Sequence, residues 1–207
     1  MTSSDWLHQP HKPRALALMP ASRSLPRNDD DDWLFRLPPY YISMIELYTD
    51  GASSGNPGPG GYGTILRTIY QGSNPAYQGK LIEKEFSGGF RKTTNNRMEL
   101  LAVIIGLEAL KSINQKVTIY SDSKYVIDAI DKKWVYGWLQ KGFQGKKNKD
   151  LWMRLMNLYK LHQIRLVWVK GHAGHPLNER CDQLAVKASK DEAHWKIDTT
   201  FEATCNS

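Results

Sequence analysis

Residues 93–110 read TTNNRMELLAVIIGLEAL, and this stretch decides what the rest of the chain can fold around. Its apolar residues would lie nearly all round a helix, and such a helix is typical of a protein core. One acid, Glu99, lies near the N-terminus of this predicted helix. Asn96, three residues earlier, predicts a capping box, and a carboxylate also suits the positive end of a helix dipole. Taken alone, Glu99 is best explained as part of a helix cap.

Strands are predicted on both sides of this helix. Three hairpin-like strands precede it, near residues 44–50, 61–70 and 81–89. After it come a strand at 116–122, a helical stretch from Ser123, a lysine-rich segment, a helix at 150–162, a strand at 164–169 and a last helix from about 176 to 190. Hairpin strands followed by strands alternating with helices predict an α/β fold, with a mixed sheet and helices packed on it.

The composition is that of a globular protein with a basic surface. The chain has 207 residues, of which 41% are hydrophobic, and a formal net charge of +7. Such a charge favours a polyanionic partner, although charge alone does not separate nucleic acid from a membrane surface. No apolar run approaches the roughly 20 residues needed to span a bilayer, and no secretory signal is recognisable. Two cysteines make no disulfide framework, which fits a reducing cytoplasm. We also expect the protein to be a monomer.

The chain divides into three parts. Residues 1–43 are rich in proline and scattered charge, which is typical of disorder, and we expect them to be dispensable, with Met44 as an alternative start. The run Asp29–Asp32 is better explained as solvated charge than as a metal site. The apolar residues between Trp33 and Tyr41 could instead pack on the domain. Residues 44–192 are expected to form that domain, and residues 193–207 a C-terminal tail.

Four acids stand where folding could bring them together. Asp50 and Asp122 end predicted strands, and strand ends are where α/β sheets collect ligands. Glu99 lies in the first turn of its helix, and Asp182 borders the apolar stripe of the last helix. Unpaired, these carboxylates would repel one another, whereas hard oxygen ligands suit Mg²⁺. Each acid alone is better explained as a cap or a surface charge, and only the set indicates a metal site.

A histidine-containing loop, KGHAGHP at residues 170–176, directly precedes the last helix. His172 and His175 have no cysteine or histidine partners at zinc-like spacing. A proton-transfer role is the better functional interpretation. The structural alternative is a pair of merely exposed histidines.

The segment from Lys132 to Lys149 contains six lysines and no acid, and aromatic residues are interleaved with the lysines. Lysines neutralise phosphates, and aromatic rings contact sugars or bases. A solvated lysine face is the usual explanation of such a run. The interleaved aromatics and the positive net charge favour a nucleic-acid surface at least as strongly.

Four motifs together resemble type 1 ribonuclease H of the bacterial kind. They are YTDGASSGNPGPGGYG, TTNNRMEL, YSDSKYV and WVKGHAGHPLNERCDQLA, and the match runs from about Met44 to Lys190. The resemblance implies a ribonuclease H-like fold with a five-stranded mixed sheet, three antiparallel strands and then parallel ones. It also implies endonucleolytic cleavage of RNA paired to DNA, leaving 5′-phosphate and 3′-hydroxyl ends. Two Mg²⁺ ions, or Mn²⁺ in their place, would be held by Asp50, Glu99, Asp122 and Asp182.

The resemblance also implies roles for other residues. His172 corresponds to the proton-handling histidine, rather than His175, and Glu179 to an auxiliary acid that helps metal turnover. Thr94 resembles a residue that holds a phosphate of the DNA strand. The other positions expected to contact the hybrid are Gly51, Ser53, Asn56, Asn95, Asn96, Arg97, Lys124, Trp134, Trp138, Lys141, Lys146, Lys147 and Lys149.

This chain departs from the family pattern in two places. Lys124 stands where many relatives have glutamine, which would change a base contact into a phosphate contact. Leu139 and Gln140 occupy positions that are often basic. Both departures concern affinity for the substrate and leave the chemistry intact.

Three other classes of protein fit less well. A non-catalytic hybrid-binding protein would not need four acids that repel phosphate, and a transposase-like nuclease would not be expected to keep TTNNRMEL or KGHAGH. A purely structural protein leaves both the glycine-rich loop and the ordered acids unexplained. The RNA–DNA hybrid is therefore the expected partner, with no membrane involved.

Overall fold

The computed structural model describes residues 44–110 and 112–205, so residues 1–43 and the expectations attached to them lie outside it. Its first half is an antiparallel sheet of β1 (Ile45–Ser53), β2 (Gly58–Ile69) and β3 (Leu81–Thr93). β4 (Lys116–Ser121) and β5 (Gln163–Trp168) extend the sheet as parallel strands, in the order β3-β2-β1-β4-β5. The mixed five-stranded sheet expected from the sequence is confirmed.

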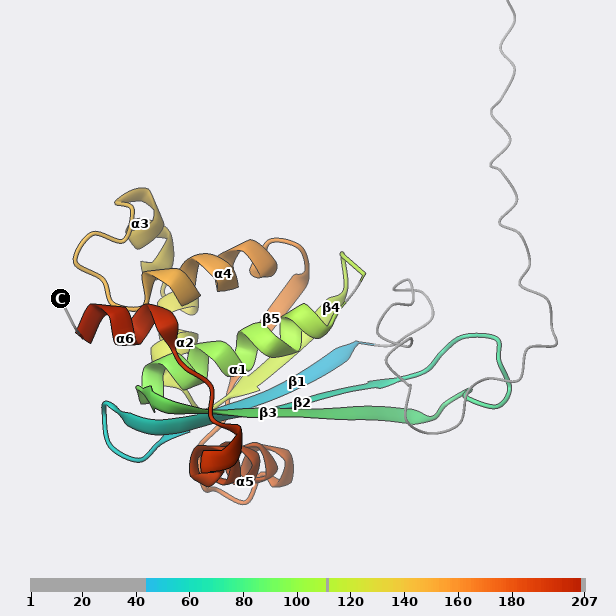
Figure 1. Ribbon diagram of the computed structural model, residues 1–207. Helices are drawn as coiled ribbons and strands as arrows, with labels where there is room; N and C mark the ends of the chain where they lie inside the picture. The colour runs from blue at the N-terminus through green and yellow to red at the C-terminus, as the bar shows by residue number, and fades with distance from the viewer. Residues whose placement is uncertain (1–43, 111, 206–207) are drawn as a thin grey trace, which may run out of the picture. The chain divides into compact units, whose positions relative to one another are not determined.

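Helices cover both faces of this sheet (Figure 1). α1 (Asn95–Ala109) packs on β1 and β2, and α4 (Lys149–Tyr159) packs on α1. α5 (Pro176–Lys190) lies on the other face, against β1, β2 and β3. The short helices α2 (Lys124–Asp131) and α3 (Trp134–Gln140) lie between β4 and α4 in the chain. α3 occupies part of the lysine-rich segment, for which the sequence predicted no helix.

The main core lies between the sheet and α1. The face of α1 that touches β1 is buried, and Leu100, Ile104 and Leu107 are completely inaccessible to solvent. Burying each such side chain contributes roughly 1.5–3 kcal/mol relative to leaving it exposed. A smaller apolar cluster on the opposite face joins Tyr48 and Ile65 of the sheet to Cys181 of α5. α1 is thus a core helix, as its sequence predicts.

β1 continues beyond Asp50, which differs from the sequence expectation. Its parallel pairing with β4 ends at Thr49 and Ser121, but its antiparallel pairing with β2 runs on to Ser53 opposite Gly60. The glycines at the start of β2 permit this extension because a side chain on Gly60 would collide with Thr93 and with the carbonyl of Ala52. Asp50 therefore sits where β1 parts from β4.

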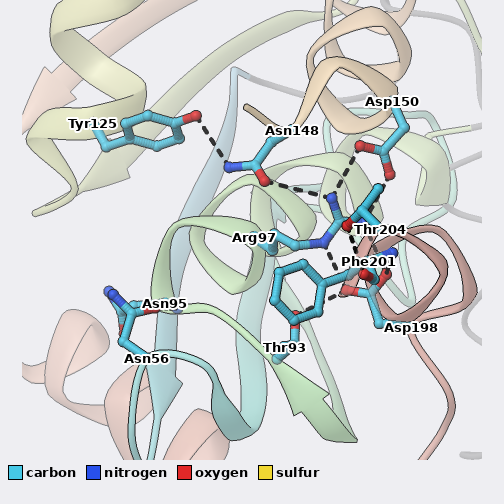
Figure 2. A network of polar contacts seen from close by, with 10 residues as sticks. All are labelled: Asn56, Thr93, Asn95, Arg97, Tyr125, Asn148, Asp150, Asp198, Phe201 and Thr204. Atoms are coloured by element: carbon cyan, nitrogen blue, oxygen red, sulfur yellow. Dashed lines mark hydrogen bonds and ion pairs between the residues drawn. The ribbon is translucent and has the colours of Figure 1, made fainter. Parts of the chain in front are cut away.

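The segment after residue 192 is packed against the domain. Lys196 pairs with Phe90 of β3, and a 3₁₀ turn at Glu192–His194 and helix α6 (Thr199–Cys205) stand on either side of it. Asp198 accepts hydrogen bonds from Arg97 Nε at 2.6 Å and from Thr93 Oγ1 at 2.8 Å (Figure 2). We therefore treat residues 193–205 as part of the packed unit rather than as a tail beyond it.

None of the helices in residues 44–110 and 112–205 is long and apolar enough to cross a membrane.

Candidate active site

Three carboxylates meet in the middle of the sheet, where the pairing of β1 with β4 ends. Asp50 comes from β1, Glu99 from the first turns of α1 and Asp122 from the residue after β4, and one oxygen of each lies within 4.8 Å of the others. Because β1 and β4 are parallel and paired at Thr49 and Ser121, Asp50 and Asp122 emerge side by side. Three of the four acids expected to form the site are therefore brought together.

Gly51 brings α1 close enough for Glu99 to join the two strand residues. A side chain at Gly51 would overlap the backbone nitrogen of Glu99 and the backbone of Met98. Its amide donates to Asp50 Oδ1 at 2.7 Å, which fixes that carboxylate. A glycine at this position is thus a requirement of close approach between strand and helix.

The capping box predicted from Asn96 and Glu99 is wrong. α1 begins at Asn95 with Thr94 as its N-cap, and the Thr94 side chain makes no capping hydrogen bond. Asn56 Oδ1 instead accepts from the Asn95 backbone N–H at 3.4 Å, and Asn95 Nδ2 donates to Glu99 Oε1 at 3.3 Å. The helix start is thus satisfied from the β1–β2 loop, which leaves Glu99 turned into the acidic cluster.

Burial and mutual repulsion disfavour the charged forms of these acids. Burial, and then the charge of Asp122, raise the pKa of Asp50 to about 7. Burial, and then the charges of Asp50 and Asp122, hold the pKa of Glu99 well above its usual range. Glu99 Oε2 is buried and has no hydrogen-bond partner. An unpaired buried oxygen beside two carboxylates suits a divalent cation, since hard cations take oxygen ligands.

Asp182 lies outside this group of three. It is half-buried on α5, and its charge contributes, after burial and Asp122, to the raised pKa of Asp50. α5 packs on β1, which keeps Asp182 on the side of the sheet that carries Asp50. The structure therefore places the fourth acid near the cluster but not in it.

The loop between β5 and α5 runs beside Asp122. A Cβ on Gly171 would lie 2.5 Å from Asp122 Oδ2, so a side chain at this position would displace the Asp122 carboxylate. The next residue, His172, is exposed and has the left-handed φ of 51°. The Gly174 amide donates to Glu179 Oε1 at 3.0 Å, which ties the loop to the first turn of α5.

His175 has a different environment from His172. It is partly buried, and its ring lies 5.3 Å from that of Tyr48 and 6.2 Å from that of Tyr120, which are stacked on each other. Its Nδ1 is buried without a hydrogen-bond partner. These contacts suit a packing role for His175 and leave His172 as the loop histidine that reaches solvent.

Arg97 is turned away from solvent, although the sequence pattern placed it among the substrate contacts. Its side chain is 5% exposed, and its guanidinium bridges Asp198 and Asp150, at 2.6 and 2.7 Å (Figure 2). Burial would lower the pKa of Arg97, but the hydrogen bonds and charges of the two acids raise it. Arg97 therefore ties α1 to α4 and to the C-terminal segment.

Most of the other expected substrate contacts fall into two groups. The first lies around the β1–β2 loop and the start of α1, beside the acidic cluster, and consists of Gly51, Ser53, Asn56, Thr94, Asn95 and Asn96. The second is the basic segment, where Lys141, Lys146, Lys147 and Lys149 are exposed. Lys132 lies over the Trp134 ring and Lys146 over the Trp138 ring, each with 5.0 Å between the ammonium nitrogen and the ring centroid.

Trp138 anchors this basic segment. Its ring meets that of buried Trp152 edge-on at 5.7 Å, and Trp152 also donates to the Tyr125 hydroxyl at 2.9 Å. Trp134, in contrast, is 49% exposed. One aromatic residue thus fixes α3 to the domain while the other stays open to solvent with the lysines.

Two residues at the site have no counterpart in the sequence predictions. Asn178 Nδ2 donates to Asp122 Oδ2 at 3.3 Å, and Trp168 Nε1 donates to the Asp122 backbone carbonyl at 3.2 Å. Lys124 stands over the Trp168 ring at 5.2 Å. A signal for Asn178 does exist, because it shares the buried face of α5 with Cys181 and Ala185, at helical spacing.

The chain is similar in sequence to known proteins. The family model described as RNase H matches residues 43–190. Ribonuclease H of Desulforamulus reducens is 54% identical over 154 residues, which cover 72% of this chain and 89% of that protein. Ribonuclease H of Rippkaea orientalis is 52% identical over 163 residues, covering 76% of this chain and 92% of that protein.

A solved structure shares the fold. The crystal structure of LC9-RNase H1, described as a type 1 RNase H with the type 2 active-site motif, is 33% identical and has a TM-score of 0.61. The match covers 70% of this chain and 72% of that one.

A five-stranded mixed sheet with clustered acids beside its parallel strands defines the class of metal-dependent nucleases with a ribonuclease H-like fold. Within that class, the chain belongs to the ribonuclease H family and is an enzyme of type 1. The family resemblance implied by the four sequence motifs is thereby confirmed.

Proposed function

We propose that this enzyme hydrolyses the RNA strand of RNA–DNA hybrids as an endonuclease and leaves 5′-phosphate and 3′-hydroxyl ends. The observation that carries the proposal is the group formed by Asp50, Glu99 and Asp122, in which the buried Glu99 Oε2 has no partner. Such a group is unfavourable in the empty protein and suits divalent cations that also bind phosphate. A basic, aromatic-lined segment on the same chain supplies the complementary charge for a nucleic acid.

In this proposal Asp50, Glu99, Asp122 and Asp182 hold two Mg²⁺ ions, for which Mn²⁺ can substitute. When bound, the ions supply an activated water and stabilisation of the departing 3′-oxygen in an in-line displacement at phosphorus. The chain itself contributes the fixed positions of the carboxylates. Gly51 and Gly171 contribute by allowing α1 and the β5–α5 loop to approach the site.

His172 would transfer the proton in this reaction. It is exposed on a loop that adjoins Asp122, and histidine is the side chain that most often transfers protons in catalysis. Glu179, in the first turn of α5, would assist metal turnover beside the same loop, which it holds through the Gly174 amide.

The hybrid would lie across the start of α1 and the basic segment. Asn56, Asn95 and Asn96 are amides suited to the 2′-hydroxyls through which a protein distinguishes RNA from DNA. Thr94 would hold a phosphate of the DNA strand, and Lys124, beside Trp168, another phosphate. Arg97 is left out of this surface because its guanidinium is buried between two acids. We further propose that the enzyme acts as a cytoplasmic monomer.

The test is a comparison of matched duplexes. The purified enzyme is incubated with RNA–DNA hybrid, double-stranded RNA and double-stranded DNA of one sequence, with Mg²⁺ and with chelator. We expect cleavage of the RNA strand of the hybrid alone, only with Mg²⁺, and fragments that polynucleotide kinase cannot label at the 5′ end without prior phosphatase. Equal cleavage of double-stranded RNA, or cleavage in chelator, would refute the proposal.

A further inference from the structure

Asn178 is a polar residue in a place that favours an apolar one. It lies in the first turn of α5, 2% exposed, on the helix face that carries Cys181 and Ala185. Its Oδ1 is buried and has no hydrogen-bond partner. A buried polar atom without a partner destabilises the fold, and a leucine at this position would carry no such atom. The amide therefore calls for an explanation other than packing.

The other end of the same amide touches a carboxylate of the acidic cluster. Asn178 Nδ2 donates to Asp122 Oδ2 at 3.3 Å, across 56 residues of sequence. The same oxygen faces Gly171, whose Cα is so close that a Cβ would lie 2.5 Å away. Oδ2 is thus enclosed by α5 and the β5–α5 loop. The Trp168 indole holds the Asp122 main chain as well, through the backbone carbonyl.

The type of donor matters as much as its position. A lysine or arginine at residue 178 would neutralise Asp122 and compete with a cation, and an aspartate would repel it. An amide N–H orients the carboxylate and leaves its full negative charge, because it carries no charge of its own. Partners of this kind behind a metal ligand are typically worth 10–100-fold in metal affinity or activity.

We propose that Asn178 is a positioning residue, which orients the Asp122 carboxylate for a divalent cation at the cost of an unsatisfied buried oxygen. The inference rests on the proposed function, since it presumes that Asp122 is a metal ligand. It extends that function to a residue that touches neither the metal nor the hybrid.

The test uses the full-length chain with Asn178→Leu. The metal-stripped proteins are melted thermally, Mn²⁺ binding to the free enzyme is measured by calorimetry, and hybrid cleavage is measured at saturating Mn²⁺. Ser189→Ala is the matched control, because Ser189 is a buried polar residue farther along α5 that donates to the Val186 carbonyl. We expect Asn178→Leu to melt at the same temperature or higher, to bind Mn²⁺ at least about tenfold more weakly, and to keep its KM for the hybrid. Ser189→Ala should bind Mn²⁺ like the wild type.

A folded Asn178→Leu variant that binds Mn²⁺ as tightly as the wild type would overturn the inference. So would a weakening that Ser189→Ala reproduces, because it would point to a packing role. If the leucine variant does not fold, Asn178→Ala takes its place with the same expected loss of Mn²⁺ affinity. A wild-type enzyme that neither binds Mn²⁺ nor cuts the hybrid would instead refute the proposed function itself.

Discussion

At the scale of single residues, the acidic cluster destabilises the metal-free protein in a way that depends on pH. The pKa of Asp50 is about 7 in the folded chain against 3.8 for an ordinary aspartate. Between these two values the folded state binds more protons than the unfolded state, so stability falls as the pH rises through that window. The raised pKa of Glu99 acts in the same direction.

Asp50→Asn should therefore stabilise the metal-free protein, and more at pH 8 than at pH 5. The measurement is the melting temperature of wild type and variant in chelator at both pH values. Glu192→Gln, on an exposed acid in the 3₁₀ turn, is the control and should shift neither. A gain from Asp50→Asn that is equal at both pH values would show that repulsion in the cluster is not its cause.

The two loop histidines should differ in their effect on turnover. His172→Ala should lower kcat by about 10²- to 10⁴-fold, the usual value of a positioned acid or base, and leave measurable cleavage. His175→Ala should lower kcat less and the melting temperature more, because His175 packs on Tyr48 and Tyr120. Steady-state kinetics and thermal melts of both variants decide this, and a reversed order would mean that the wrong histidine was chosen.

Some of the site residues could be predicted from the sequence alone, namely those that stand in a recognisable local pattern. Asp122 directly follows an apolar strand, Asp50 stands where the alternating pattern of β1 ends, and Glu99 lies near the start of an apolar helix. Taken together, these positions mark the three acids as candidates. Asn178 could not be assigned in this way because its partner, Asp122, lies 56 residues away. For the same reason the burial of Arg97 was missed, since its partners are 53 and 101 residues further along the chain.

At the scale of elements, the C-terminal segment depends on one buried ion-pair network. Arg97 of α1 lies between Asp150 of α4 and Asp198 of the segment that leads into α6 (Figure 2). Phe201 of α6 also lies against this guanidinium, 5.8 Å from ring centroid to Cζ. Removing one acid would leave a buried cation with a single acidic partner.

Asp198→Ala should lower the free energy of unfolding by about 3 kcal/mol, the lower end of the range for breaking a buried pair, because Asp150 remains. The free energy of unfolding of the wild type and of the variant is measured by urea denaturation. Glu202→Gln, in the pair with Arg91, whose side chain is 53% exposed, should have a much smaller effect because ion pairs near the surface contribute little. If the two variants lose the same stability, burial of the network does not determine its contribution.

The elements themselves were predictable where one periodicity dominates. The strands and α1 follow from apolar pattern alone, and the parallel half of the sheet follows from alternation of strand and helix. The packing of residues 193–205 was not predictable, because the segment is mostly exposed and is held by the distant residues Phe90, Thr93 and Arg97. α3 was not predicted because it has only seven residues, too few for a helical period to stand out, although Trp134 and Trp138 are four residues apart.

At the scale of the whole molecule, the net charge of +7 favours binding to a polyanionic substrate. The exposed lysines 146, 147 and 149 lie on the segment that also carries Trp138. Replacing all three with alanine should raise the KM for the hybrid and keep kcat at saturation. Each lost phosphate contact should reduce the slope of log affinity against log salt by up to about 0.9.

The matched control replaces Lys80, Lys116 and Lys160 with alanine. This triple variant changes the net charge by the same amount as the first one. Lys116 begins β4, at the strand end opposite Asp122, and Lys160 directly follows α4 near the start of β5. Lys80 directly precedes β3 at the far end of the β2–β3 hairpin. The control should leave the salt slope almost unchanged. Equal slopes for the two triple variants would mean that overall charge, rather than a defined surface, binds the hybrid.

The central claim is that the carboxylates of Asp50, Glu99 and Asp122 hold the metal with which the enzyme cuts a bound hybrid. The most direct measurement is cleavage and binding of one RNA–DNA hybrid by Asp122→Asn in Mg²⁺, with binding followed by gel shift. Cleavage should be nearly abolished, because a metal ligand has lost its charge, while binding survives on phosphate contacts. Appreciable cleavage by the variant would contradict the account.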